Sequence, residues 1–245
     1  MLDGLYSAAA GMEAQQEQID ALSNDVANVS TPGYQATRVD FHDLLYTSGG
    51  LAGSGTNVST GSGSAANIVG RSEVEGSLQP TGRSLDVAIQ GQGFIEVRRP
   101  DGSVGLTRNG SLQVDGQGRL TSDTGLLLQP PVRLPAGTAT ESLKIAPNGV
   151  IRSGTKVLGR ITLVTVPAPD RLLADGEGVF SPTAASGGVR GAVGATLQQG
   201  ALEGSNVDLS NTMGQMIDAQ RGYSMASRAI QMQDQMLQIA NGVKR

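Results

Sequence analysis

The sequence predicts an α+β fold in which long N- and C-terminal helices pair as a coiled-coil-like domain, with a central mainly-β domain between them in the chain. Apolar side chains recur at helical spacing near both ends of the 245-residue chain, over residues 2–29 and 207–241. Between about residues 70 and 200 the spacing changes to the period of two that is typical of strands. We therefore divide the chain into an N-terminal helix (1–33), an extended, Gly-Ser-rich linker loop (34–67), a central β domain (68–202) and a C-terminal helix (203–245).

The N-terminal helix carries one apolar stripe, which is interrupted by a glutamine. Its members follow one another in steps of three and four, so they share one face of a helix. We expect the helix to end near Val29, because Pro32 disfavours a helical conformation at Thr31 and Gly33 can adopt a positive φ. The predicted stripe consists of Leu5, Ala9, Met12, Gln16, Ile19, Leu22, Val26 and Val29.

The C-terminal helix is expected to begin after Gly204, where Ser205 and Asp208 have the spacing of a capping box, and to run for about 35 residues, or about 50 Å. It carries two apolar stripes, and the second lies roughly 200° around the helix from the first. The first stripe consists of Met213, Met216, Gln220, Tyr223, Ser227, Ile230, Asp234 and Leu237, and the second of Met225, Ala229, Met232, Met236, Ile239 and Val243.

The two stripes have a functional consequence. A helix that is apolar on two opposite faces cannot be covered by one partner, so it needs its own chain on one side and another molecule on the other. This pattern is typical of an assembly subunit rather than of an enzyme. Glutamines on both helices can form hydrogen bonds between close-packed helices without burying charge. They are Gln15, Gln16, Gln18, Gln215, Gln220, Gln231, Gln233, Gln235 and Gln238.

The central part of the chain alternates short apolar runs with turn dipeptides, which predicts a β-meander. Asn-Gly and Asp-Gly supply the positive φ of a tight hairpin turn. The segment 167–200 is rich in Pro, Gly, Ala and Ser, and we expect loops there with two short strands. The apolar runs are 87–89, 94–97, 112–114, 143–145 and 161–166, and exposed turns are expected at Asp101-Gly102, Asn109-Gly110, Asp115-Gly116 and Asn148-Gly149.

Residues 47–67 contain no charged residue and almost no large apolar side chain. A segment of this composition cannot form a core of its own. We expect a flexible linker or a long surface loop, with ordering only on assembly as the alternative.

The composition excludes several classes of protein. The net charge of −4 and the scattered Lys and Arg residues argue against a nucleic-acid surface. Cysteine is absent, which removes disulfides, thiolate metal sites and cysteine nucleophiles. No apolar run approaches the ~20 residues of a membrane span. The start of the chain, Met1-Leu2-Asp3-Gly4, lacks the pattern of a secretory signal, so we expect export without a cleavable signal peptide and no membrane insertion.

Candidate catalytic and metal-binding residues are few. His42 is the single histidine, so a metal site or a catalytic triad would have to be built around it alone. Asp170, Asp175 and Glu177 cluster in a Gly-rich stretch but match no acid–base motif. Gly91-Gln92-Gly93 resembles the start of a dinucleotide fingerprint, but no helical pattern follows it. We therefore predict no catalytic residue, no metal and no cofactor, and a chain that is not an enzyme.

Three stretches resemble the rod and hook family of bacterial flagellar axial proteins. Residues 21–34 resemble the N-terminal signature of that family, residues 86–97 its entry into the β domain, and residues 203–237 its C-terminal signature. One departure is Ala226, where relatives often carry Asn. The positions that carry the motif or the assembly stripes are Asn24, Ala27, Asn28, Thr31, Gly33, Tyr34, Gln220, Arg221, Tyr223, Ile230, Met236 and Leu237.

The resemblance implies a structural subunit, and the length of the chain favours a rod protein over the longer hook proteins. Residues 40–46, the Gly-Ser-rich stretch and the turn at 100–102 favour the distal rod. Such a subunit would polymerise helically into the driveshaft that transmits torque from motor to hook. It would lie in the basal body, spanning the periplasm and cell wall. Its partners would be copies of itself, proximal rod proteins, hook protein, envelope ring (bushing) proteins and the flagellar type III export apparatus.

Two alternatives stay open. Within the family, the chain could be a proximal rod subunit or a hook-type axial protein. Outside it, the chain could be a secreted interaction or adhesin module that binds its partner through the β domain.

Overall fold

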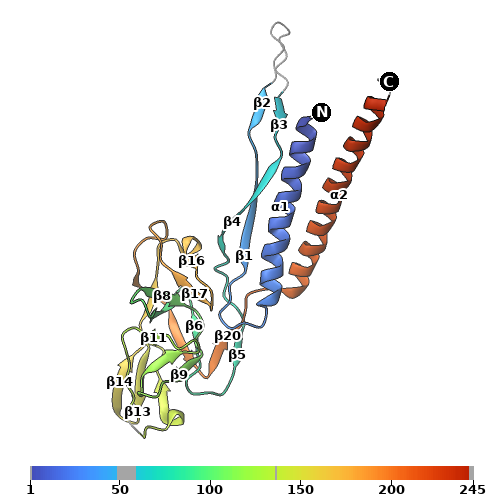
Figure 1. The fold of residues 1–245 in the computed structure, drawn as a ribbon. Coiled ribbons are helices and arrows are strands. Elements are labelled where there is room, and N and C mark those ends of the chain that lie inside the picture. Colours follow the sequence, from blue (N-terminus) through green and yellow to red (C-terminus); the bar gives the residue numbers. More distant parts are fainter. Residues whose placement is uncertain (1, 49–58, 136, 243–245) are drawn as a thin grey trace. The chain divides into compact units, whose positions relative to one another are not determined.

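A computed structural model describes residues 2–48, 59–135 and 137–242 of the chain (Figure 1). The chain divides into two compact units. The helical unit contains Met1–Ala27, Thr37–Val69 and Asp208–Arg245, and the β-rich unit contains Asn28–Ala36 and Gly70–Val207. The chain therefore passes between the units after residues 27, 36, 69 and 207.

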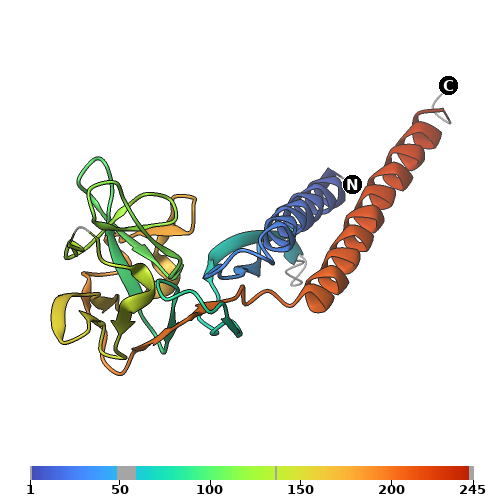
Figure 2. The same cartoon turned by 90° about the horizontal axis from the view of Figure 1, so that it is seen from below.

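The helical unit is built on α1 (Leu2–Ala27) and α2 (Leu209–Gly242). The two helices lie side by side and run in opposite directions, as Figures 1 and 2 show. Together with the mainly β character of the rest of the chain, they confirm the α+β class. Neither helix has, over its described residues, the sustained apolar run that crossing a bilayer demands.

A long β ribbon belongs to the same unit. Strand β1 (Thr37–Asp43) pairs with β4 (Ser64–Arg71), and β2 (Tyr46–Ser48) pairs with β3 (Ser59–Gly61). Helix α1 contacts β1 as well as α2, so it has partners on two sides. The segment 47–67, which the composition suggested would be a linker or surface loop, thus includes strand residues at both of its ends, whereas residues 49–58 lie outside the described part of the chain.

The β-rich unit consists of short strands. Its largest sheet has the order β16-β17-β8-β7-β11-β10-β9, and β15 pairs with both β7 and β18. Smaller sheets pair β12-β13-β14, β19-β6 and β20-β5. The strands are β5 (Leu78–Pro80), β6 (Val87–Gln90), β7 (Phe94–Arg98), β8 (Val104–Thr107), β9 (Leu112–Val114), β10 (Leu120–Ser122), β11 (Leu127–Leu128), β12 (Leu143–Ile145), β13 (Val150–Ser153), β14 (Lys156–Arg160), β15 (Leu163–Thr165), β16 (Leu173–Ala174), β17 (Val179–Ser181), β18 (Arg190–Gly191), β19 (Thr196–Gln199) and β20 (Ala201–Glu203), with short 3-10 turns at Thr140–Ser142 and Pro169–Arg171.

The predicted apolar runs all contain strands, and their inward-facing side chains form the core. One cluster joins aliphatic residues of β6, β7, β9, β10, β12, β13 and β19, among them Ile89, Ile95 and Leu120. A second cluster surrounds Phe94 and Phe180, whose rings meet edge to face at 5.9 Å. The sheet order is more complex than a meander, because β11 is inserted between β7 and β10.

The predicted turns have mixed outcomes. The hairpins β7–β8 and β12–β13 turn at Gly102 (φ 85°) and Gly149 (φ 81°), as expected. In the β9–β10 hairpin the positive φ falls on Gly118 instead of Gly116. The prediction at Asn109-Gly110 is wrong, because β8 and β9 do not pair and Asn109 is buried. The Asn109 side chain instead donates to Asp123 Oδ2 at 2.8 Å.

Both helix boundaries near the family signatures differ from the predicted ones by a few residues. Helix α1 ends at Ala27, two residues before the predicted Val29. Helix α2 begins at Leu209, because Asp208 and not Ser205 is its cap. Asp208 Oδ1 accepts the amide hydrogens of Ser210 (3.0 Å) and Asn211 (3.2 Å), which would otherwise lack partners in the first turn.

Candidate functional site

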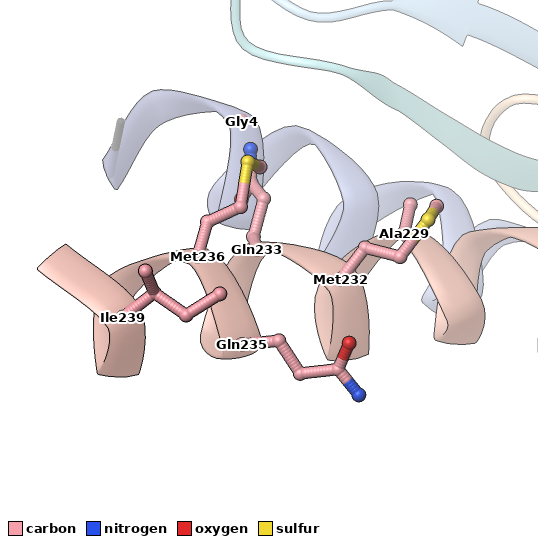
Figure 3. Close-up of a pocket in the computed structure, with 7 residues that line it drawn as sticks. All are labelled: Gly4, Ala229, Met232, Gln233, Gln235, Met236 and Ile239. Atoms are coloured by element: carbon pink, nitrogen blue, oxygen red, sulfur yellow. The ribbon is translucent and has the colours of Figure 1, made fainter.

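The face of α2 that packs on α1 consists of small and medium-sized residues. Ala219 and Thr212 are buried there. Two close contacts show how tightly the helices approach: Gly222 lies against the Gln15 side chain, and Gly4 of α1 lies against the Gln233 side chain (Figure 3). The residues of this inner face, which follow one another in steps of three and four, are Thr212, Met216, Ala219, Gly222, Ala226, Ile230, Gln233 and Leu237.

This inner face corrects the predicted first stripe. Met216, Ile230 and Leu237 lie on it as predicted, but Met213, Gln220, Tyr223 and Asp234 are exposed. In place of Gln220, Ser227 and Asp234, the inner face contains the residues one position earlier in the chain, which are Ala219, Ala226 and Gln233. A helix–helix contact selects residues that allow close approach, and at Ala219 the small side chain fits better than that of the neighbouring Gln220.

The second stripe of α2 is exposed, and its described large residues form a continuous series along the helix. Because the true inner face begins one residue earlier than predicted, the second stripe lies about 120° around the helix from it, and not on the opposite side. It therefore flanks the contact with α1, and Ala229 at its edge is partly buried. The exposed fractions of its described large residues are 66% for Met225, 58% for Met232, 56% for Met236 and 68% for Ile239, whereas the side chain of Val243 lies outside the described residues.

A shallow groove runs along this exposed stripe. Figure 3 shows Gln233 reaching from α2 to Gly4 of α1, with Met232 and Met236 beside it. The Oε1 atom of Gln233 is buried and has no hydrogen-bond partner within the described residues. Methionine side chains are flexible and polarisable, so they adapt to a partner surface. The groove therefore offers an adaptable apolar surface to a partner.

The buried residues of helix α1 also differ from the stripe that the sequence predicted. Leu22 is buried as predicted, but Ala9 and Gln16 are exposed. The other buried residues of α1 are Ala14, Ala21 and Asp25. Because α1 has two partners, its buried surface is not a single stripe. Asp25 was not singled out from the sequence, and its carboxylate accepts the Thr37 amide hydrogen at 3.0 and 3.2 Å, which ties α1 to β1.

The family-signature residues occupy several different surroundings. Asn24 and Ala27 are exposed near the end of α1, and Asn28 and Thr31 are linked by a 3.1 Å side-chain hydrogen bond in the following turn. Gly33 is buried. On α2, Ile230 and Leu237 lie on the inner face, and the exposed residues are Gln220, Arg221, Tyr223 and Met236.

Gly33 and Tyr34 belong to a group of segments that we call the collar: residues 33–36, 71–76 and 203–206 of the β-rich unit. Gly33 has φ 69°, and a Cβ atom there would lie 2.7 Å from the backbone of Arg108 and Asn109. Only glycine meets both conditions. The Arg71 guanidinium lies over the Tyr34 ring, 5.2 Å from its centroid, and donates to the Gln35 carbonyl at 2.8 Å.

A buried ion pair joins the collar to the core of the same unit. The Nε atom of Arg108 donates to Glu203 Oε2 at 2.8 Å, and each side chain is only 3% exposed. Other polar atoms of the pair also have hydrogen-bond partners. Arg108 Nη1 donates to the Gly93 carbonyl at 3.1 Å, and Glu203 Oε1 accepts the Gly76 amide hydrogen at 3.1 Å. Glu203 comes from a stretch that resembles the family, but no local pattern marks Arg108 and Glu203 as partners.

Of the candidate acid–base residues, Asp175 has a structural role. Asp175 accepts hydrogen bonds from Ser181 and Arg99, and these hold the pKa of its carboxyl group below the usual value. A carboxyl group that stays charged in this way cannot serve as a general acid near neutral pH. His42 is exposed on the ribbon strand β1.

The fold and these surfaces define a class: a structural assembly subunit whose long helices leave an apolar stripe uncovered. Three family models match the chain. The model described as Flagella basal body rod protein matches residues 5–35, the Flagellar hook protein FlgE/F/G D1 domain matches residues 88–153, and the C-terminal model of the Flagellar basal body rod FlgEFG protein matches residues 198–243.

Curated relatives agree with these models over the whole chain. The flagellar basal-body rod protein FlgG of Borreliella burgdorferi is 36% identical over 100% of both chains, and FlgG of Bacillus subtilis is 32% identical over 100% of both. The rod protein FlgF of Escherichia coli is 30% identical over 92% of each chain. The chain belongs to the family of flagellar basal-body rod proteins. It is a structural subunit of the distal rod and not an enzyme.

Proposed function

We propose that this subunit polymerises helically into the driveshaft that transmits torque from the motor to the hook. The observation that carries the proposal is the exposed second stripe of α2, Met225, Met232, Met236 and Ile239. Burying one methionine or isoleucine side chain contributes about 1.5–3 kcal/mol. A stripe of four such residues, repeated in every subunit, supplies a lateral contact that is strong only when many copies assemble.

In this proposal α1 and α2 form a coiled-coil-like pair, and the exposed stripe packs against the helix pair of a neighbouring copy. The groove beside Gly4 receives the neighbour, and the flexible methionines Met232 and Met236 adapt to its surface. The glutamine Gln235, which is exposed and lines the groove, then bonds across the contact without placing a charge in it.

The other components follow from membership of the family. We propose that the subunit contacts proximal rod proteins, hook protein and the envelope ring proteins, and that the type III export apparatus delivers it without a cleavable signal peptide. It would span the periplasm and cell wall within the basal body. We assign assembly contacts to the signature residues, among which Gln220, Arg221, Tyr223 and Met236 are exposed on α2.

The test replaces Met232 and Met236 together with aspartate in the chromosomal copy. We expect the double variant to be exported but not incorporated, because carboxylates on the stripe cannot be buried without a partner. Motility should be lost, and the subunit should accumulate in the medium, where immunoblotting detects it. Gln231→Asp is the matched control, since it adds a charge to an exposed position of the same helix outside the stripe. Normal rods and swimming in the double variant would refute the proposed contact.

A further inference from the structure

The side chain of Asn206 forms hydrogen bonds to two other segments of the collar. Its Oδ1 atom accepts the Ala36 amide hydrogen at 2.7 Å, and its Nδ2 atom donates to the carbonyls of Ser72 (3.2 Å) and Val74 (2.7 Å). The backbone amide of Asn206 also donates to the Tyr34 carbonyl at 3.2 Å. One residue therefore cross-links the segments 33–36, 71–76 and 203–206.

The cross-linked segments lie where the chain crosses between the two units. The chain leaves the β-rich unit after Ala36, re-enters it at Gly70 and leaves it again after Val207. Each collar segment is thus the stretch of the β-rich unit next to one of these crossings. A force applied through any of these three crossings acts first on the collar, whereas the fourth crossing, after Ala27, lies outside it. Asn206 bonds to the collar segments at the other two of the three crossings.

We infer that Asn206 is a clamp: a positioning residue that holds together, within the β-rich unit, the segments at three of the four points where the chain crosses between the units. The Ser72 amide hydrogen bond to the Ala36 carbonyl (2.8 Å) and the Gly33 amide hydrogen bond to the Glu203 carbonyl (2.8 Å) reinforce the clamp. Separating the segments requires these bonds and those of Asn206 to break together, so the collar opens as a unit or not at all.

The chemistry of the clamp is specific to asparagine. The position requires one acceptor and two donors on a short planar group, which is the inventory of a carboxamide. Aspartate has the same shape but would place a carboxylate oxygen against the carbonyls of Ser72 and Val74. The Asp variant therefore separates a hydrogen-bonding role from a space-filling one.

The experiment measures amide hydrogen exchange and tryptic cleavage on the purified full-length chain. In Asn206→Ala and in Asn206→Asp we expect exchange at the Ala36 and Ser72 amides, and cleavage after Arg71, to become about tenfold faster or more. Amides of the core strands β7 and β8, such as those of Ile95 and Leu106, should keep their protection. Cleavage after Arg38, an exposed arginine of β1, provides the internal reference.

Asn211→Ala is the matched control, because Asn211 is exposed and its backbone amide, which bonds to Asp208, is kept. Unchanged exchange at Ala36 and Ser72 in both Asn206 variants would overturn the clamp. An Asp variant that behaves like the wild type would also overturn it, since only shape would then matter, and so would an equal loss of protection in β7 and β8. The measurement needs no polymer, so its failure is distinguishable from a failure of the proposed rod contact.

Discussion

At the scale of single residues, the buried pair of Arg108 and Glu203 combines a large desolvation cost with a strong charge-assisted hydrogen bond. Removing both charges from water is costly, and the cost is offset here by a 2.8 Å charge-assisted hydrogen bond and by backbone partners for the remaining polar atoms. The pair can be replaced as a whole more easily than it can be broken, because breaking it leaves one charge buried without a counter-ion.

We therefore expect Glu203→Gln to destabilise the β-rich unit by about 3–5 kcal/mol, as measured by chemical denaturation. The double variant Arg108→Met with Glu203→Met should recover most of this loss. Asp115→Asn is the control, since its partner Arg119 and Asp115 itself are both considerably more exposed, and such pairs contribute about 1 kcal/mol or less. A Glu203→Gln variant as stable as the control would show that the pair is not buried in solution.

At the scale of elements, the register of α2 on α1 is decided by small side chains. Ala219 is 2% exposed, whereas the adjacent Gln220 is exposed. Since a helix turns by about 100° per residue, neighbouring positions can have opposite environments. The sequence pattern could not distinguish a stripe through 220 and 234 from one through 219 and 233, because alanine and glutamine give almost no hydrophobic signal.

The adjacent pair allows a sharp test of this register. Ala219→Asp should weaken the packing of the two helices by about 3 kcal/mol or more, because the new carboxylate faces α1 without a partner. Gln220→Asp should change it little. Hydrogen exchange of the α1 amides reports the difference, with faster exchange expected only in the first variant. Equal effects of the two substitutions would mean that α2 is rotated relative to the described inner face.

At the scale of the whole molecule, the β-rich unit is completed by segments from distant parts of the chain. Strand β20 (Ala201–Glu203) pairs with β5, and the Gly33 amide donates to the Glu203 carbonyl at 2.8 Å. The last strand, β20, thus supplies Glu203, the carboxylate that pairs with Arg108. The end of the central domain that the sequence suggests, residue 202, stops one residue before that charge.

A pair of fragments tests which boundary supports folding. We expect residues 28–207 to unfold cooperatively, because all partners of Arg108 are present, whereas residues 28–200 should melt at a clearly lower temperature or lack a cooperative transition. Circular dichroism during heating measures both. Identical melting curves would indicate that β20 and Glu203 do not contribute to the stability of the unit.

The sequence by itself determined the features that depend on local signals. Helical spacing predicted α1 and α2, the Asp101-Gly102 and Asn148-Gly149 dipeptides predicted two hairpins, and the Met-rich stripe of α2 predicted an apolar surface that is exposed in the structure. The combination of three short motifs also identified the family. These signals are local because periodicity, turn conformation and surface composition each depend on residues close together in the chain.

Only the tertiary structure decided which distant residues meet. Arg108 and Glu203 are 95 positions apart, and Ala36 and Asn206 are 170 apart, so nothing local marks them as partners. The inner face of α2 likewise depends on its packing against α1. Asn109 is buried and donates a hydrogen bond to Asp123, although its dipeptide is typical of an exposed turn. A buried polar group must find a partner wherever the fold supplies one, and that requirement is met in three dimensions, not along the chain.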